Sequence, residues 1–217
     1  MMIKKKIITA ALLAFSVLPN AMGQGIVKKM MSHIYAGVKA EGNTSNFFLS
    51  NVDDYKSRLS YGGGIGGYLG LKITPHFAIQ EDFLVYYRSS TFEQKQTLQE
   101  TDFENIGAQM AFYAMYKKNA GIGKLNIGVG PYAEYGLWAR SKQDVVETNL
   151  YKEYDNKEAA LKRFNAGAAV TVGYEFNFGL QVNASYKIGV FNSLNKSTND
   201  AAMRPSMVSV GIGYRVF

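Results

Sequence analysis

Eight stretches of this sequence alternate between apolar and polar residues with a period of two. That period is typical of β-strands, in which successive side chains point to opposite faces of a sheet. The sequence therefore predicts an all-β protein. The eight predicted strands are residues 32–41, 58–73, 77–88, 105–117, 124–140, 163–176, 179–192 and 205–217.

The two faces of these predicted strands indicate what each face contacts. One face is apolar along every strand, with Glu81 as its charged exception. The opposite face collects most of the strand glycines, together with Asn, Gln, Ser and scattered charges. A face in water would carry many Lys and Glu, whereas the inside of a narrow barrel needs small residues beside large ones such as Tyr68, Tyr132 and Trp138. We therefore expect the apolar face to contact lipid.

The connections between the predicted strands alternate in length. Short turns follow strands two, four and six, and long polar connections follow strands one, three, five and seven, at 42–57, 89–104, 141–162 and 193–204. This pattern predicts an eight-stranded antiparallel up-and-down transmembrane β-barrel of the outer membrane. The even strand number places both termini on the periplasmic side and the long loops outside the cell.

The N-terminal residues have the layout of an export signal. Lys4, Lys5 and Lys6 precede an apolar stretch, 7–18, which is too short to span a membrane as a helix. Small residues around Gly23 suit cleavage. We expect residues 1–23 to be a signal peptide, residues 24–31 a short periplasmic segment, and residues 32–217 the barrel domain.

Composition argues against several classes of function. The chain has no Cys, which excludes disulfides and thiolate metal sites, and its two His are too few for a multi-His zinc site. The expected signal peptide holds three of the 24 basic residues and none of the 17 acidic ones, so its removal lowers the net charge from +7 to +4. Because no basic run remains, we expect no nucleic-acid partner, and also no metal and no cofactor.

Four arginines fall at the long-loop end of the predicted strands, on the inward face. Guanidinium groups gathered at such a rim bind anions, for example the phosphates of lipopolysaccharide. The alternative is a lining of structural ion pairs that neutralises inward acids, and we favour this alternative. The four residues are Arg58, Arg88, Arg140 and Arg163.

Several short motifs lie along the chain in a characteristic order. They are Gly130-Pro131-Tyr132, Arg163-Phe164-Asn165-Ala166-Gly167, Gly173-Tyr174-Glu175-Phe176, Tyr186 with Gly189, and the ending 211–217. Over residues 32–217 the chain resembles, by these motifs, the PorT-like outer-membrane β-barrel family of Bacteroidetes-type bacteria. The resemblance implies a Gram-negative outer-membrane barrel, inserted by the barrel assembly machinery and sometimes linked to protein secretion.

Two residues depart from the pattern that this resemblance implies. The terminal Phe217 lies three residues after the nearest aromatic, Tyr214, where the insertion signal has a spacing of two. Glu81 lies on the lipid face, so it either sits near a membrane interface or is turned inward by a β-bulge.

We expect a non-enzymatic protein with no catalytic residues, acting as a structural, surface-interaction or secretion and envelope-assembly accessory component. The expected partners are outer-membrane lipid, lipopolysaccharide, and envelope or secretion proteins. One alternative is a lipid A-modifying enzyme, which needs a nucleophile and a base at the membrane edge that His33 and His76 do not supply. A second alternative, a soluble ligand-binding eight-stranded barrel, is opposed by the uncharged outer face.

Overall fold

The computed structural model describes residues 32–51, 55–94, 100–143, 146–152, 159–195 and 201–217. The expected signal peptide and the segment 24–31 lie outside these residues. No helix in the described part is long and apolar enough to cross a membrane. The strands are β1 (Ile34–Ser50), β2 (Tyr55–Lys72), β3 (Phe77–Gln94), β4 (Glu100–Ala120), β5 (Gly123–Gln143), β6 (Val146–Asn149), β7 (Phe164–Phe176), β8 (Leu180–Gly189) and β9 (Ala202–Arg215).

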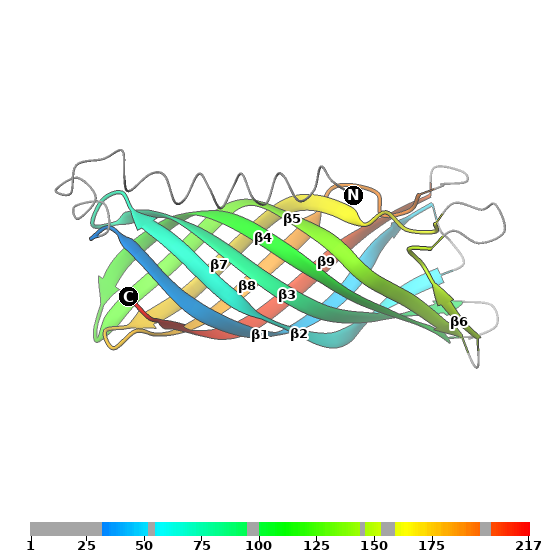
Figure 1. Ribbon diagram of the computed structural model, residues 1–217, viewed down its shortest axis with the longest axis horizontal. Helices are drawn as coiled ribbons and strands as arrows, with labels where there is room; N and C mark the ends of the chain where they lie inside the picture. The colour runs from blue at the N-terminus through cyan, green and yellow to red at the C-terminus, as the bar shows by residue number, and fades with distance from the viewer. Residues whose placement is uncertain (1–31, 52–54, 95–99, 144–145, 153–158, 196–200) are drawn as a thin grey trace, which may run out of the picture.

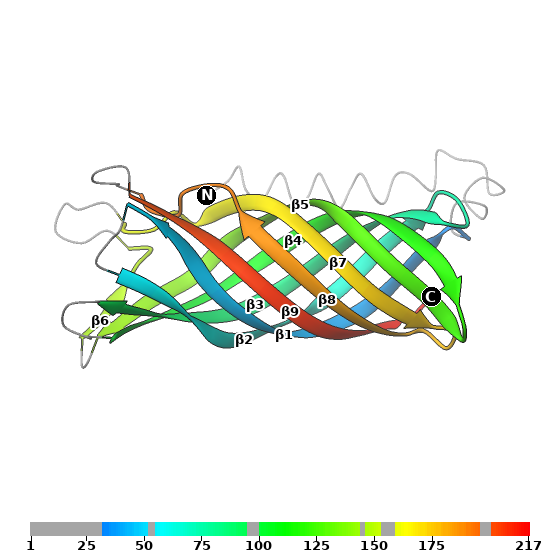
Figure 2. The same cartoon turned by 180° about the vertical axis from the view of Figure 1, so that it is seen from behind.

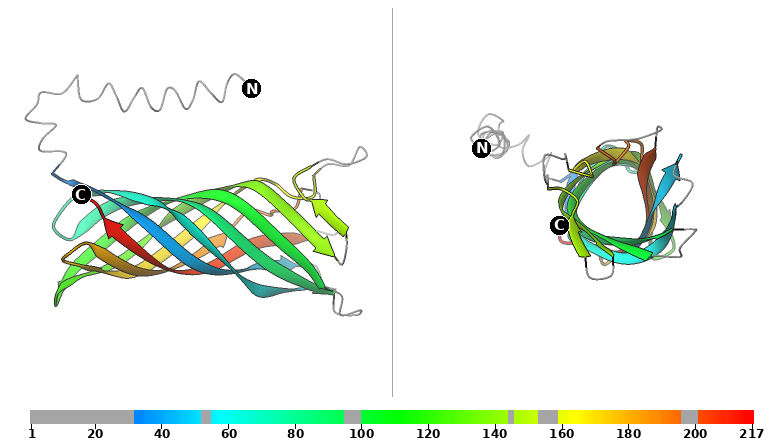
Figure 3. Two further views of the ribbon diagram at one scale, coloured as in Figure 1. Left: turned by 60° about the horizontal axis from the view of Figure 1, so that its bottom comes forward. Right: turned by 90° about the vertical axis from the view of Figure 1, so that its right-hand side faces the viewer.

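Eight of these strands form one closed antiparallel ring. Pairing runs from β1 through β2, β3, β4 and β5 to β7, β8 and β9, and β9 pairs with β1 to close the sheet. The short β6 pairs with β5 and prolongs it as a hairpin. The side views in Figures 1 and 2 show the tilted strands, and the end view in Figure 3 shows the ring. The predicted eight-stranded up-and-down barrel is confirmed.

The ring has two unlike ends. At one end, short turns at 73–76, 121–122 and 177–179 join the strands, and β1 starts and β9 stops there. We call this the turn end; it carries the C-terminus in Figure 1. The opposite end, where β6 lies, receives the longer connections and is the loop end.

Six strands extend further toward the loop end than the sequence predicts, β2 and β9 by three residues each, from Tyr55 and Ala202. β1 continues to Ser50, β3 to Gln94 and β5 to Gln143, while β4 already begins at Glu100. These extensions are rich in polar residues, which is why sequence patterns assign them to loops. Backbone hydrogen bonds between neighbouring strands hold them in the sheet whatever their polarity. By contrast, β7 begins only at Phe164 and β8 stops at Gly189, so the wall is lower there.

The outward face is apolar along the middle of the ring, as predicted. Ile65, Val210 and Phe83 are 70%, 60% and 47% exposed, because no protein covers them. Phe77 and Tyr116 pack edge to face at the turn end with their ring centroids 5.3 Å apart. Such exposed apolar surface is stable where lipid, not water, surrounds it.

Glu81 points outward between Leu69 and Phe112. The strand register is regular on both sides of it, so the bulge explanation is wrong. It lies four residues after Phe77, the first residue of β3, near the turn end of the wall. A carboxylate that close to the end of a strand is tolerated far better than one at the bilayer midplane.

Two β-bulges change which side chains face inward near the loop end. One lies between Leu59 and Gly63 in β2, and the other lies opposite Ile106 in β5. Because a bulge adds one residue to one strand, it reverses the alternation beyond it. Trp138 and Arg140, predicted inward, therefore point outward, and Ala139, predicted outward, is completely buried inside. Arg58 pairs in register with Thr91 and also points outward, against the prediction.

Glycines on the inward face make room for large neighbours, as predicted. A Cβ on Gly37 would overlap the Tyr68 ring as well as the Tyr214 carbonyl oxygen, and a Cβ on Gly107 would lie 2.5 Å from the Tyr86 hydroxyl. At Gly66 the obstacle is backbone alone, since a Cβ would overlap the Phe83 carbonyl oxygen. The narrow ring therefore depends on residues without side chains at these points.

We expect Gly66→Ala to destabilise the barrel by about 1–3 kcal/mol, because β3 must move to accept the new methyl group. The matched control is Gly42→Ala, where a Cβ meets nothing within 4 Å. Urea titration of both variants in detergent, followed by the difference in gel migration between unboiled and boiled samples, measures the effect. Equal unfolding midpoints for the two variants would show that the close approach at Gly66 is unimportant.

Candidate functional site

The middle of the lumen is filled by a chain of hydrogen-bonded side chains. Lys39 Nζ donates to Asp82 at 2.8 Å and lies 3.6 Å from Glu41. Lys187 Nζ approaches the other Glu41 oxygen at 3.2 Å. All four side chains are buried, with at most 5% of each residue exposed. The two lysines and two carboxylates therefore form a neutral cluster, which we call the central network.

Amides and hydroxyls extend the central network across the lumen. Gln109 donates to Glu41 at 3.3 Å, and Gln80 donates to Asp82 at 2.7 Å. The Tyr35 hydroxyl donates to Gln80 at 3.1 Å. These partners come from β1, β3 and β4, while Lys187 comes from β8. The network thus ties strands on different sides of the ring to one another.

Further ion pairs lie above and below the central network. Toward the loop end, both terminal nitrogens of Arg88 contact Glu134, at 3.0 and 3.2 Å. Toward the turn end, Glu175 pairs with Lys117 and Arg215. Pairing of this kind offsets the cost of placing charges in a narrow interior.

The remaining space inside the lumen is small. Tyr35, Tyr68, Tyr113, Met115 and Tyr132 pack together between the polar groups, all at most 4% exposed. One cavity beside Lys39 and Asp82 measures about 20 Å³, and another beside Arg88 and Glu134 measures about 10 Å³. Cavities of that size hold about one water molecule each. The side chains therefore plug the barrel.

The four arginines predicted at the rim are each engaged by different partners. Arg58, with 59% of its side chain exposed, contacts Glu93 at 2.8 Å and Glu100 at 3.0 Å. Arg140 contacts Glu104 and, at 3.2 Å, Glu147. Arg88 is held by Glu134 inside the lumen.

Arg163 differs from the other three, because its partners are backbone carbonyls. It donates to the carbonyls of Gly136, Leu137 and Tyr151, and its guanidinium lies 4.6 Å from the Tyr151 ring centroid. Two of the four arginines, Arg58 and Arg140, thus point outward. All four contact other groups of this chain. Binding of anions at this rim stays a prediction.

The residues considered for chemistry do not assemble into a reactive group. His76 stacks on Tyr116, and its Nδ1 lies 3.1 Å from the Lys117 carbonyl oxygen. The buried carboxylates of Asp82 and Glu134 are paired with Lys39 and Arg88. Among the described residues, no three metal-ligating side chains come together.

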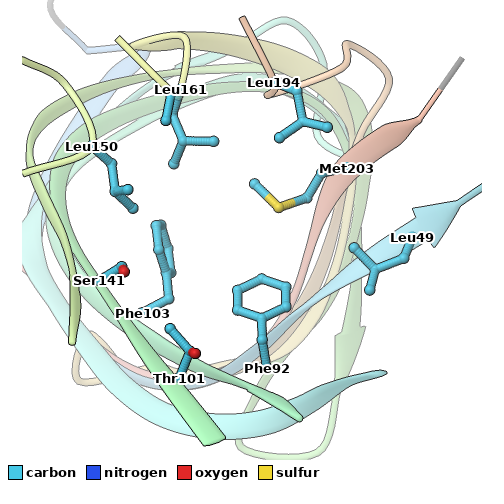
Figure 4. A pocket seen from close by; sticks show the side chains of 10 residues that line it. Leu49, Phe92, Thr101, Phe103, Ser141, Leu150, Leu161, Leu194 and Met203 are labelled. Carbon is cyan, nitrogen blue, oxygen red and sulfur yellow. The ribbon is translucent and has the colours of Figure 1, made fainter. Parts of the chain in front are cut away.

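The sequence analysis missed an apolar cup at the loop end. Its space is about 330 Å³. Figure 4 shows the side chains pointing toward one another from several strands and loops. Because all ten lining residues lie in segments predicted as polar loops, only the apolar residues within those loops could have signalled it. The cup is lined by Leu49, Phe92, Thr101, Phe103, Ser141, Leu150, Ala160, Leu161, Leu194 and Met203.

Segments beyond the ring help to form this cup. Leu161 pairs with Leu194 through an isolated backbone bridge and is only 7% exposed. Tyr151 packs beside them, its hydroxyl accepting a hydrogen bond from Asn105 at 2.8 Å. Burial raises the pKa of Tyr151, so it stays a neutral phenol. The described part of the connection after β5 therefore folds onto the mouth of the barrel.

We expect Glu41→Gln to destabilise the barrel by about 3–5 kcal/mol, because it leaves two buried lysines with one carboxylate. The control is Glu100→Gln at the solvent-exposed pair with Arg58, where a loss of at most about 1 kcal/mol is expected. Urea unfolding of both variants in lipid vesicles, monitored by Trp138 fluorescence, compares them. Similar midpoints would contradict the stabilising role of the central network.

Comparison with known proteins adds the family. The sequence from residue 7 to 215 matches the family described as outer membrane protein beta-barrel domain. No curated protein matches the sequence.

Several solved structures are similar in fold. OprG from Pseudomonas aeruginosa is 12% identical, with a TM-score of 0.47 over 84% of this chain and 93% of OprG. Ail, the attachment invasion locus protein of Yersinia pestis, is 11% identical, with a TM-score of 0.41 over 83% and 97%. Neisserial surface protein A is 14% identical, with a TM-score of 0.42 over 82% and 96%. The family match spans most of the sequence, so the chain belongs to the outer membrane protein beta-barrel domain family and is an outer-membrane protein.

Proposed function

We propose that this protein is a plugged, non-enzymatic barrel that acts through its loop end and its outer wall, as a structural, surface-interaction or secretion and envelope-assembly accessory component. In this proposal the turn end and both termini face the periplasm, and the loop end faces outward. The short turns suit the periplasmic side, as in other barrels of the bacterial outer membrane.

The observation that carries the proposal is the plugged lumen. The central network, the Arg88–Glu134 pair and the Glu175 cluster lie one above another along the barrel. A solute passing through would have to separate buried ion pairs, which is strongly unfavourable. Function by contact at the ends therefore fits this architecture better than function by passage.

The resemblance to PorT-like barrels implies a link to secretion, but the residues that carry it belong to the scaffold. The motifs that resemble PorT-like barrels fall on the wall and lumen: Tyr132 packs inside, and Glu175 holds Lys117 and Arg215. These are scaffold positions, so the resemblance concerns how the barrel is built. The partner itself must then be recognised by the parts that differ, at the loop end.

The enzymatic alternative, modification of lipid A, needs an activated nucleophile near the outer leaflet. The described histidines lie at the turn end, with His76 in the turn before β3 and His33 just before β1. Incubation of the folded protein with lipopolysaccharide separates the two functions. A change in the mass of lipid A would contradict the non-enzymatic proposal.

We expect the folded protein to give no steady current steps in planar lipid bilayers, because the side chains of the central network close the lumen. Single-channel recording of the mature chain measures this, with protein-free bilayers as the control. Protein recovered from the bilayer must still shift in gel migration on boiling, which proves that it was folded. Reproducible steps would refute the plug and favour solute passage.

We expect partner contacts to map to the loop end. A photo-crosslinking amino acid at Thr148 in β6 should give discrete protein adducts in native outer membranes, whereas the same change at Phe178 in a turn-end turn should not. Both positions are exposed, so accessibility is matched. Adducts from Phe178 alone would move the interaction to the periplasmic side and contradict the proposal.

A further inference from the structure

We propose that the apolar cup at the loop end is a binding site for a small, uncharged, predominantly apolar molecule. This inference goes beyond the proposed function, since a plugged barrel can contact partners without holding any ligand. It rests on the chemistry of the lining, on a closed floor, and on a low section of the wall beside it.

The lining selects against charge. Eight of the ten lining residues are apolar, the other two are Thr101 and Ser141, and none carries a charge. A space of about 330 Å³ falls at the lower end of the range of small-molecule sites, roughly 300–1,000 Å³. An apolar guest of matching size gains from leaving water, whereas an ion would lose its hydration without a partner.

Thr101 and Ser141 add two hydroxyls to the otherwise apolar cup. Thr101 pairs in register with Phe92, and Ser141 pairs with Phe103, and both phenylalanines face inward. The two hydroxyls therefore lie on the same inner side of the neighbouring strands β4 and β5 (Figure 4). This arrangement suits a ligand with one hydroxyl or carbonyl group at one end, because hydroxyls both donate and accept hydrogen bonds.

The floor of the cup is closed. Phe47 stacks on Phe92 at 5.7 Å and meets Phe103 edge to face at 5.2 Å, centroid to centroid. Beneath them the Arg88 guanidinium lies 5.5 Å from the Phe47 ring centroid and is held by Glu134. A molecule that enters the cup therefore stops there and is held, because the plugged lumen offers no way onward.

The wall beside the cup is low, and the cup adjoins a second hollow on the outside. This outer hollow, about 570 Å³, is lined by Phe164, Phe191 and Leu161, and also by Lys162 and Arg163. Leu161 also lines the cup, while Phe164, the first residue of β7, and Phe191, just after β8, are exposed. A small apolar molecule can thus approach either from water through the mouth or from the lipid past Leu161.

A photoreactive probe tests the site. Aryl diazirine, a small neutral apolar molecule, is added to the folded protein in lipid nanodiscs, and adducts are located by mass spectrometry. We expect saturable labelling of cup residues that excess unreactive benzyl alcohol suppresses at least tenfold. Labelling of lipid-facing residues such as Val210 should not saturate. A carboxylate-bearing diazirine should not label the cup saturably.

Neighbouring residues on β1 provide a matched pair of variants. Leu49 lines the cup, whereas Phe48 points outward and is 47% exposed. Leu49→Trp should fill the cup and abolish the saturable labelling, and Phe48→Trp should leave it unchanged. Leu194→Trp, on another segment, should fill the cup in the same way. Competition by benzyl alcohol in the unaltered protein tests the site even if both variants fail to fold. Non-saturable labelling of the cup, or labelling that survives both filling variants, would overturn the proposal.

A second experiment tests whether the ligand enters the cup from water or from lipid. The same labelling is repeated in amphipol, which supplies no bilayer. Half-saturation at the same total probe concentration supports entry from water. A higher half-saturating probe concentration in amphipol than in nanodiscs supports entry from the lipid past Leu161. In both cases the cup is the site, and absence of saturable labelling in both media overturns it.

Discussion

The pairing of β1 with β9 is the interaction on which the rest of this structure depends. Hydrocarbon offers no partner for free backbone N–H and C=O groups, so a sheet that crosses a membrane must close on itself. Closure with eight strands leaves an interior only wide enough for side chains. The tight fit at Gly37 and Gly66, and the complete pairing of Lys39, Glu41, Asp82 and Lys187, follow from that width. The closed wall therefore determines which side chains can fill the lumen.

Much of this arrangement could be predicted from the sequence, because the side-chain period of a strand is strict. The alternation predicts that Tyr68 and Tyr132 point inward, and their burial, each 4% exposed, confirms it. The alternation predicts the wrong face for residues beyond a bulge. Trp138 and Arg140 lie past the bulge in β5, which begins at Gly136, but glycine is too frequent in these strands to single out that position. A pattern that assumes regular alternation has no means of detecting one extra residue.

The loop-end part of the site escaped prediction for a different reason. The sequence reading took polar composition as the sign of a loop, yet 42–50 and 89–94 are strand. Outside the bilayer a strand no longer needs an apolar outer face. Polar residues there show that the strand has passed from lipid into water, while the sheet itself continues. Which loop residues fold back also depends on long-range contacts, such as that of Leu161 with Leu194.

Along one row of paired residues, where the bulges also lie, the apolar and polar faces of the sheet exchange sides. Gly63, Tyr87, Ile106 and Trp138 are paired in succession across β2, β3, β4 and β5. On the turn-end side of this row, apolar residues face out and polar residues face in.

On the loop-end side of that row the arrangement is inverted. Phe47, Phe103 and Met203 form an apolar core inside, while Glu104 and Arg140 pair outside. This section resembles a soluble barrel, with water outside and a hydrophobic core of its own. Its core is incomplete, because the wall is low at β7 and β8. The apolar cup is thus the unfilled part of a small core, and that is a physical reason for it to accept an apolar guest.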